Sequence, residues 1–182
     1  MRNVPVCSVR ILSARHYDEV FIAHAYHLDV VKRKLTVATD LAIRGEGDVT
    51  VTLADAGAGI VAKGGQLMLD DLVFEGYDGS GAVLTVDGGA MTLGAGVVLR
   101  DIVGWSDHSA ALFVRQGVAT SAATFVNCQN NGKGIAAGGG AVTVGCLDTW
   151  SAGSYSLVLT GGSITGCWAK VYGGGVFAYE KA

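Results

Sequence analysis

Short segments in which apolar residues alternate with small or polar ones recur along most of the chain. Examples are LTV, AMTL, AVTV and LVLT, and their composition and period favour β-strands. No stripe with the 3.6-residue period of a helix runs between residues 45 and 182. Glycine pairs interrupt the segments at residues 64–65, 88–89, 139–140 and 161–162, where we expect turns. The pattern predicts many short strands joined by glycine-containing turns.

The predicted strands form a repeat of about 22 to 28 residues with insertions of variable length. Each repeat begins with a small residue and a short apolar strand, turns at glycine and continues into a second short strand. Five stretches follow this plan, and they begin at Gly59, Ala82, Ala111, Ala141 and Gly175. Repeats of this kind bury their apolar residues by stacking, with each strand paired to its equivalent one coil away. We therefore expect an all-β parallel β-helix.

Two glycine triplets each stand directly before an apolar strand, in GGGAVTVG (138–145) and YGGGVFAY (172–179). A coil must change direction sharply between short strands, and glycine reaches the φ > 0 that such corners often need. The neighbouring coil is only about 4.8 Å away, which also disfavours a bulky corner side chain. We expect these glycines at corners and the following Ala or Val in the core.

The chain is predicted to be one continuous domain, with an N-terminal cap over residues 1–34 and coils over 35–182. Early strands are expected around Val20–Ile22, Leu35–Val37 and Leu41–Ile43, with GEG as a turn after the last. At the other end, GGGVFAYEKA begins a new coil and leaves strand edges of the kind that proteins normally cover. We expect an open or partner-covered C-terminal end, stacked on further coils or on another subunit.

Composition narrows the classes of partner. Half of the 182 residues are apolar, with 28 glycines and a single proline, which excludes collagen and disordered Pro/Gly-rich linkers. Thirteen Lys and Arg against sixteen Asp and Glu give no basic field for nucleic acid or an anionic membrane. No apolar run reaches the roughly 18 residues of a membrane helix, and no signal peptide is visible. We expect neither nucleic-acid binding nor membrane insertion.

The four cysteines, Cys7, Cys128, Cys146 and Cys167, do not have the close spacing of metal ligands. They are also few for a disulfide-rich domain of this length. The sequence therefore predicts buried free thiols, no metal and no cofactor.

Several motifs resemble known β-helix families. LTVATDLAIRGEGDVTVTL followed by GGQLMLDDLVFEG resembles the opening of right-handed parallel β-helix domains of the pectin-lyase-like class. FVNC (125–128) with GGGAV (138–142) resembles the alternating motifs of polymorphic outer-membrane proteins and related surface adhesins, as do GGAM (88–91) and GGGV (173–176). The likeness covers about residues 30–180. It implies a single-stranded, right-handed parallel β-helix solenoid at the cell surface or secreted.

The resemblance to pectin-lyase-like enzymes implies that catalytic residues, if present, would be acidic residues with an arginine or lysine in a groove on the outside of the coils. The candidates are Asp70 and Asp71 in LDDL, with Arg100 and Asp101 in LRDI on a neighbouring coil. Adjacent residues of a strand point to opposite faces, so Asp70 and Asp71 line one groove only if a bulge intervenes. We interpret these four residues as solvated strand ends in preference to a catalytic group.

An aromatic corner is the other candidate site. Counting from the strand ends places Tyr77, Trp105 and Trp168 at one corner of different coils, with Gln129 between them. Asp107 and His108 belong to the insertion WSDHS at the same corner, and insertions in repeat proteins usually gather on the working face. Exposed aromatic rings suit stacking on sugars or anchoring a protein, although rings also pack together simply to seal a turn.

Two functions remain open at this point. The first is a non-catalytic β-helix module with an adhesion or scaffold role, binding a glycan or another protein. The alternative is a carbohydrate-active β-helix enzyme, such as a polysaccharide lyase, hydrolase or epimerase, or a fragment of one. The enzyme would need carboxylates that converge in one exterior groove.

Overall fold

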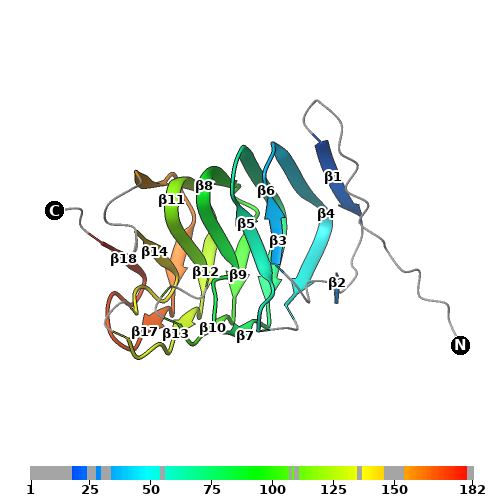
Figure 1. Ribbon diagram of the computed structural model, residues 1–182. Coiled ribbons are helices and arrows are strands. Elements are labelled where there is room, and N and C mark those ends of the chain that lie inside the picture. Colours follow the sequence, from blue (N-terminus) through cyan, green and yellow to red (C-terminus); the bar gives the residue numbers. More distant parts are fainter. Residues whose placement is uncertain are drawn as a thin grey trace, which may run out of the picture.

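The chain folds into a parallel β-solenoid of about four turns (Figure 1). The computed structural model describes residues 18–23, 28–29, 34–53, 56–106, 108, 111–134, 137–145 and 154–179. Within these ranges every regular element is a strand, and every strand pair is parallel. The described residues contain no helix, and therefore none long and apolar enough to cross a membrane. The predicted all-β class and stacked parallel strands are confirmed.

Each complete coil has four sides, which we number in chain order. Side 1 contains β3 (Lys34–Val37), β5 (Gly59–Ala62), the starts of β8 (Leu84–Leu93) and β11 (Leu112–Ser121), β14 (Val142–Val144) and β18 (Val176–Ala178). Side 2 contains β1 (Asp18–Ala23), the starts of β4 (Leu41–Thr52) and β6 (Gln66–Glu75), the ends of β8 and β11, and β15 (Tyr155–Leu159).

The other two sides complete the coil. Side 3 contains β2 (Leu28–Asp29), the ends of β4 and β6, β9 (Val98–Arg100), β12 (Thr124–Val126) and β16 (Ser163–Thr165). Side 4 contains β7 (Asp78–Gly79), β10 (Val103–Gly104), β13 (Gln129–Asn130) and β17 (Trp168–Ala169). Sides 1 to 3 belong to one sheet that turns at its corners, and side 4 is a separate sheet.

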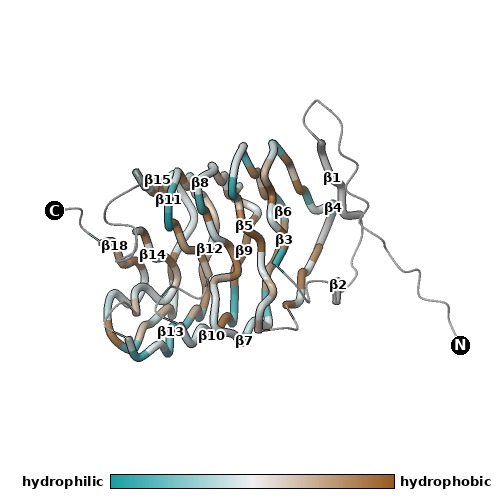
Figure 2. The backbone as a smooth tube through the Cα atoms, in the orientation of Figure 1, coloured by the Kyte–Doolittle hydropathy of each residue, from teal (hydrophilic) through white to brown (hydrophobic). Residues whose placement is uncertain are grey.

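The core is a set of vertical stacks of equivalent side chains. Strand residues alternate in direction, so every second residue of each side points inward and lies over its equivalent in the next coil. On side 3 the register aligns Phe74, Leu99, Phe125 and Ile164. The first three are buried, and brown apolar stretches follow the stacked strands in Figure 2. The continuous apolar column is the main stabilising feature of the fold.

The corner between sides 3 and 4 confirms only part of the glycine expectation. Gly76, Asp101, Asn127 and Gly166 occupy equivalent corner positions, and all four have positive φ, between 52° and 74°. Asp and Asn tolerate this left-handed conformation better than most residues because their short polar side chains bond locally. Here the Asn127 amide donates to the Asp101 carboxylate at 3.2 Å. A corner that needs φ > 0 is therefore filled by either glycine or a short polar residue.

The two predicted reasons for glycine apply to different triplets: Gly173 has φ = 52°, whereas the triplet at 138–140 is required by the close approach of other chain segments. A Cβ on Gly140 would overlap the carbonyl oxygens of Gly174 and Trp168, and a Cβ on Gly138 would lie 2.7 Å from the Phe177 ring. Close approach between insertion and coil, rather than left-handed φ, requires glycine here. Val142, after this triplet, is fully buried as expected, whereas Val176, after the triplet at 173–175, is 38% exposed and does not follow the expectation.

The early strands are confirmed, but the GEG turn is not. β4 continues from Leu41 to Thr52, and its register against β6 shifts between Arg44 and Val49, so the glycines lie in a bend inside one strand. β1 and β2 extend the ladder beside β4, within the part predicted as a cap. Residues 1–17, 24–27 and 30–33 of that cap lie outside the described residues.

The spacing between equivalent coil residues grows along the chain beyond the predicted period. Ile60, Leu84, Leu112, Val142 and Val176 are equivalent on side 1. In the last coil the added residues lie between β14 on side 1 and β15 on side 2. In the earlier coils they lie between side 4 and side 1, where the chain must return to the start of a coil. These insertions shape the candidate site described next.

Candidate functional site

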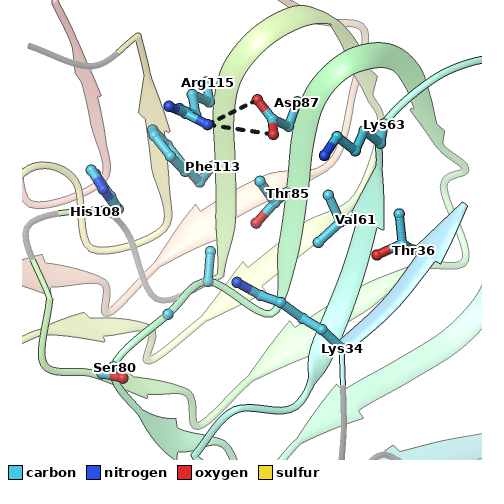
Figure 3. Close-up of a pocket in the computed structure, with 12 residues that line it drawn as sticks. Lys34, Thr36, Val61, Lys63, Ser80, Thr85, Asp87, His108, Phe113 and Arg115 are labelled. Carbon is cyan, nitrogen blue, oxygen red and sulfur yellow. Dashed lines mark hydrogen bonds and ion pairs between the residues drawn. The ribbon is translucent and has the colours of Figure 1, made fainter. Parts of the chain in front are cut away.

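A groove with a volume of about 370 Å³ lies on the outer surface of side 1 (Figure 3). Strands β3, β5, β8 and β11 supply its floor and one row of charged side chains. Residues 80–82 and His108, from the insertions between side 4 and side 1, line its other edge. Its volume falls within the range of about 300–1,000 Å³ that is common for ligand pockets.

The floor consists of outward-facing residues at equivalent positions of successive coils. They are Thr36, Val61, Thr85 and Phe113. Val61 and Thr85 are each 9% exposed and Phe113 is 4% exposed, which is unusual for the outer face of a strand. The His108 ring stacks on Phe113 with centroids 4.2 Å apart and planes at 7°, so the insertion covers this end of the floor.

A buried tyrosine fixes the first rim of the groove. The Tyr77 hydroxyl donates to the carbonyl oxygen of Ala56 at 3.0 Å and accepts the N–H of Gly81 at 2.8 Å. Its side chain is 1% exposed, and burial raises the pKa of this phenol, so it remains a neutral donor near pH 7. Tyr77 thus holds the segment that contains Gly81 against the core.

A buried asparagine fixes the second rim. The Asn130 amide nitrogen donates to the carbonyl oxygens of His108 at 2.6 Å and Gly138 at 2.9 Å, and its oxygen accepts the N–H of Gly132 at 2.9 Å. The residue is fully buried, so these bonds replace its lost hydration. One side chain therefore ties the insertion that carries His108 to the following one.

Charged groups line the groove beside the strands. Lys63, Asp87 and Arg115 follow side 1 in three successive coils, and Arg115 Nη1 lies 3.3 Å from the nearer Asp87 oxygen. Lys34 enters from the start of β3, with its Nζ close to Gly81 on the opposite rim. Within the described residues, neither lysine has a carboxylate at ion-pair distance. The groove thus carries three cations and one anion, in a chain of net charge −3.

Figure 3 shows how these charges lie relative to one another. Lys63 and Lys34 lie on opposite sides of Val61 and Thr85 in this view, while Arg115 is turned toward Asp87. The two ammonium groups are therefore free to meet an anion, and the Thr85 hydroxyl lies between them. This arrangement can neutralise and hydrogen-bond a carboxylate or sulfate group of a ligand.

The acidic candidates from the sequence lie away from this groove. Asp71 has φ = 51° and turns β6 from side 2 to side 3, which is the irregularity that lets both aspartates face outward. A Cβ on Gly94 or on Gly96 would overlap the Asp70 or the Asp71 carboxylate, respectively, so both side chains extend over the turn of the next coil.

The other two candidates have separate partners. Arg100 forms an ion pair with Glu75 at 2.6 Å, and Asp101 accepts the Asn127 amide at the opposite end of side 3 from Asp71. The structure therefore does not bring Asp70, Asp71, Arg100 and Asp101 together in one site.

The register does not place Tyr77, Trp105 and Trp168 at equivalent positions of one corner, as we predicted. The register aligns Gln129 with Trp168, as expected, but their equivalents in the earlier coils are Val103 and Asp78. Tyr77 precedes this row by one residue and is buried, whereas Trp105 follows it by two. The error has a physical cause: Ile102 is apolar and fully buried just past the corner, so it looked like the end of a strand.

The candidate ligand residues therefore separate into different surroundings. Trp105 is 55% exposed and its indole N–H donates to the Asp78 carboxylate, while Trp168 is 42% exposed two coils away. His108 lines the groove, Tyr77 supports its rim, and Asp107 lies outside the described residues. A ligand role for Trp105 and Trp168 stays a prediction.

Sequence reasoning missed the charged row of the groove, although a signal was present. AKGG, VDGG and VRQG each place one charged residue between an apolar strand and a glycine, in three consecutive repeats.

Within the described residues, no three His, Cys, Asp or Glu side chains converge as a metal site. No protein-family model matches the chain, and neither does any curated protein or solved structure.

Proposed function

We propose that this chain is a non-catalytic β-helix module of a surface or secreted protein, and that it holds an acidic glycan in the groove on side 1. The surface location and adhesion role follow from the resemblance to pectin-lyase-like domains and surface adhesins. The observation that carries the proposal is the charge of the groove: its described lining contains three cations, Lys34, Lys63 and Arg115, and one carboxylate, in a protein with a net negative charge.

The chemistry of the lining favours binding over bond cleavage. Asp87 is the one carboxylate among the described residues that line the groove, and it is engaged by Arg115. Glycoside hydrolysis typically uses two carboxyl groups on opposite sides of the bond. An acidic oligosaccharide would instead place one carboxylate between Lys34 and Lys63, with hydroxyl groups of its sugar rings near Thr36 and Thr85.

The rigidity of the groove supports this proposal. Tyr77 and Asn130 hold the two rims through bonds to backbone atoms, and the floor is part of the solenoid ladder. A preformed site loses little conformational freedom when a stiff sugar chain binds. We expect weak to moderate affinity that falls as salt rises, because the interaction depends on exposed charges.

The test compares a short oligomer of uronic acid with the same oligomer after its carboxyl groups have been reduced to alcohols. Isothermal titration should detect the acidic oligomer and show at least tenfold weaker binding of the reduced one. Lys34→Gln and Lys63→Gln should each weaken binding roughly tenfold, about 1.4 kcal/mol. Lys170→Gln removes the same charge from the exposed surface of β17's coil and serves as the control.

Three outcomes would overturn the proposal. Equal binding of the acidic and reduced oligomers would exclude charge recognition. Unchanged binding in both lysine variants would remove this groove as the site. Shortening of the acidic oligomer during incubation, abolished in Asp87→Asn, would favour the enzyme alternative.

A further inference from the structure

Cys128 and Cys167 occupy equivalent positions on successive coils, at the corner between sides 3 and 4. The adjacent pairs Gln129 with Trp168 and Val126 with Thr165 establish this register on both sides of the cysteines. The backbone N–H of Cys128 donates to Cys167 Sγ at 3.4 Å. Neighbouring strands lie about 4.8 Å apart, which falls within the Cα separation of about 4.4–6.8 Å that disulfides span.

The two thiols differ in access to solvent. Cys128 is fully buried, and its Sγ lies 3.4 Å from the carbonyl oxygen of Leu99 and 3.6 Å from that of Val126. Cys167 is partly exposed, with its Sγ 3.5 Å from the carbonyl oxygen of Thr165. Both are free thiols. A reagent from solvent therefore reaches Cys167 first.

The local hydrogen bonds also make Cys167 the more reactive of the pair. The neighbouring Cys128 thiol, together with the Cys128 N–H, lowers the pKa of Cys167 to about 7. Donation to the Cys167 sulfur, with burial, raises the pKa of Cys128. Because the thiolate is the nucleophile, Cys167 is suited to the first attack and Cys128 to the second.

We propose that Cys128 and Cys167 are a redox-active pair, which a soluble disulfide oxidant converts into a covalent bond between the coils of β13 and β17. Cys167 thiolate attacks one sulfur of the oxidant RSSR, forming a mixed disulfide and releasing one RS⁻. Cys128, on losing its proton, attacks Cys167 Sγ and releases the second RS⁻. The two thiol protons end on the two leaving groups, so the chain loses two hydrogens and RSSR becomes two RSH.

The consequence for the fold follows from where the bond lies. β15, β16 and β17 pair with the preceding coil, and their side chains are mostly exposed or partly exposed. Val158 is 49% and Leu159 is 50% exposed. A bond from Cys167 to the buried Cys128 would fasten this coil to the core by constraining its open forms. This inference does not depend on the proposed glycan groove.

The test uses the full chain carrying Cys7→Ser and Cys146→Ser, incubated with oxidised glutathione. Both remaining thiols should disappear together, and digestion without reduction should yield one cross-linked peptide that joins Cys128 and Cys167. In the further variant Cys128→Ser, a stable glutathione adduct should accumulate on Cys167. Hydrogen exchange at residues 155–169 should slow at least tenfold in the oxidised chain, and dithiothreitol should reverse this.

Two results would overturn the proposal. The first is a stable adduct on Cys167 while Cys128 stays reduced, since the geometry would then not permit the second attack. The second is bond formation with no change in exchange at residues 155–169. If the serine variants fail to fold, peptide mapping of the oxidised wild-type chain decides the matter, and cross-links that use Cys7 or Cys146 in place of this pair count against it.

Discussion

The coil of β11–β13 and the coil of β15–β17 use the same backbone ladder, yet they bury equivalent residues very differently. Phe125 and Ile164 are aligned on side 3, but Phe125 is 1% exposed and Ile164 is only partly buried. On side 2, Ser121 is fully buried while its equivalent Leu159 is half exposed. We name the first the middle coil and the second the last coil.

The contrast shows that stacking from both sides, more than residue type, determines burial in this solenoid. Ser121 is polar but sits between Leu93 and Leu159 in its stack, and its hydroxyl accepts the N–H of Ala123 at 3.2 Å. Leu159 is apolar, but among the described residues only the middle coil covers it. Middle-coil side chains should therefore dominate stability, and last-coil side chains should contribute less.

The largest expected difference comes from removing the side-3 core residues. Phe125→Ala should lower the free energy of unfolding by about 3–5 kcal/mol, since it leaves a cavity between Leu99 and Ile164. Ile164→Ala should lower it by roughly 1 kcal/mol, because a partly exposed side chain leaves less unfilled volume. Chemical denaturation of both variants measures this difference, and equal losses would show that the last coil is covered in solution.

The buried amide of the middle coil should produce the next largest effect. Asn130→Ala removes the partner of the His108 and Gly138 carbonyls and the Gly132 N–H, at an expected loss of about 1–3 kcal/mol. Its last-coil equivalent is Ala169, where Ala169→Ser should change stability by less than about 0.5 kcal/mol. Thermal unfolding compares them, and a neutral Asn130→Ala would mean that the groove rims are held by other contacts.

The stacked strands could be predicted from sequence because their signals are local and repeated. Alternation specified β-strands, glycine specified many corners, and the repeat specified stacking. The left-handed Asp101 and Asn127 were missed because either residue is also ordinary at an exposed strand end. Lys63, Asp87 and Arg115 were missed for a related reason: a charged residue before a turn usually faces solvent alone. The groove exists only because the insertions fold back over side 1, a long-range event that Tyr77 and Asn130 stabilise.

Substitutions at the left-handed corner between sides 3 and 4 should lower stability by similar amounts in the middle and last coils, whereas substitutions in the core should not. Asn127→Ala places a residue without a local polar group at φ = 52° and loses the bond to Asp101, so we expect a loss of about 1–2 kcal/mol. Asn127→Gly should be milder, because glycine accepts this φ freely. Gly166→Ala in the last coil should also lose about 1 kcal/mol, because it strains the backbone at φ = 65° and brings a Cβ against the Asn127 amide oxygen. Urea denaturation tests this, and a harmless Gly166→Ala would show that the last coil relaxes its backbone.

The smallest effect expected is the pH dependence of stability that the two cysteines create in the reduced protein. The pKa of Cys167 is lowered from the ordinary 9.0 to about 7, so its thiolate stabilises the folded state above 9.0, and this contribution is lost as pH falls through about 7. Above pH 9.0, Cys128 lowers the stability of the folded state, because its pKa is raised there and ionisation of its thiol favours the unfolded chain. Between pH 7 and 9, Cys167 should therefore determine how the stability of the folded state changes with pH.

Solvent screening of the partly exposed Cys167 should limit the gain to less than about 1 kcal/mol. The measurement is the melting temperature across this range under reducing conditions, for wild type and Cys167→Ser. Wild type should rise relative to the variant as pH increases from 7 to 9. If the melting temperatures of wild type and Cys167→Ser change in parallel with pH, solvent cancels the effect of the thiol–thiolate hydrogen bond in the last coil. The two coils would then differ in their electrostatics as well as in their packing.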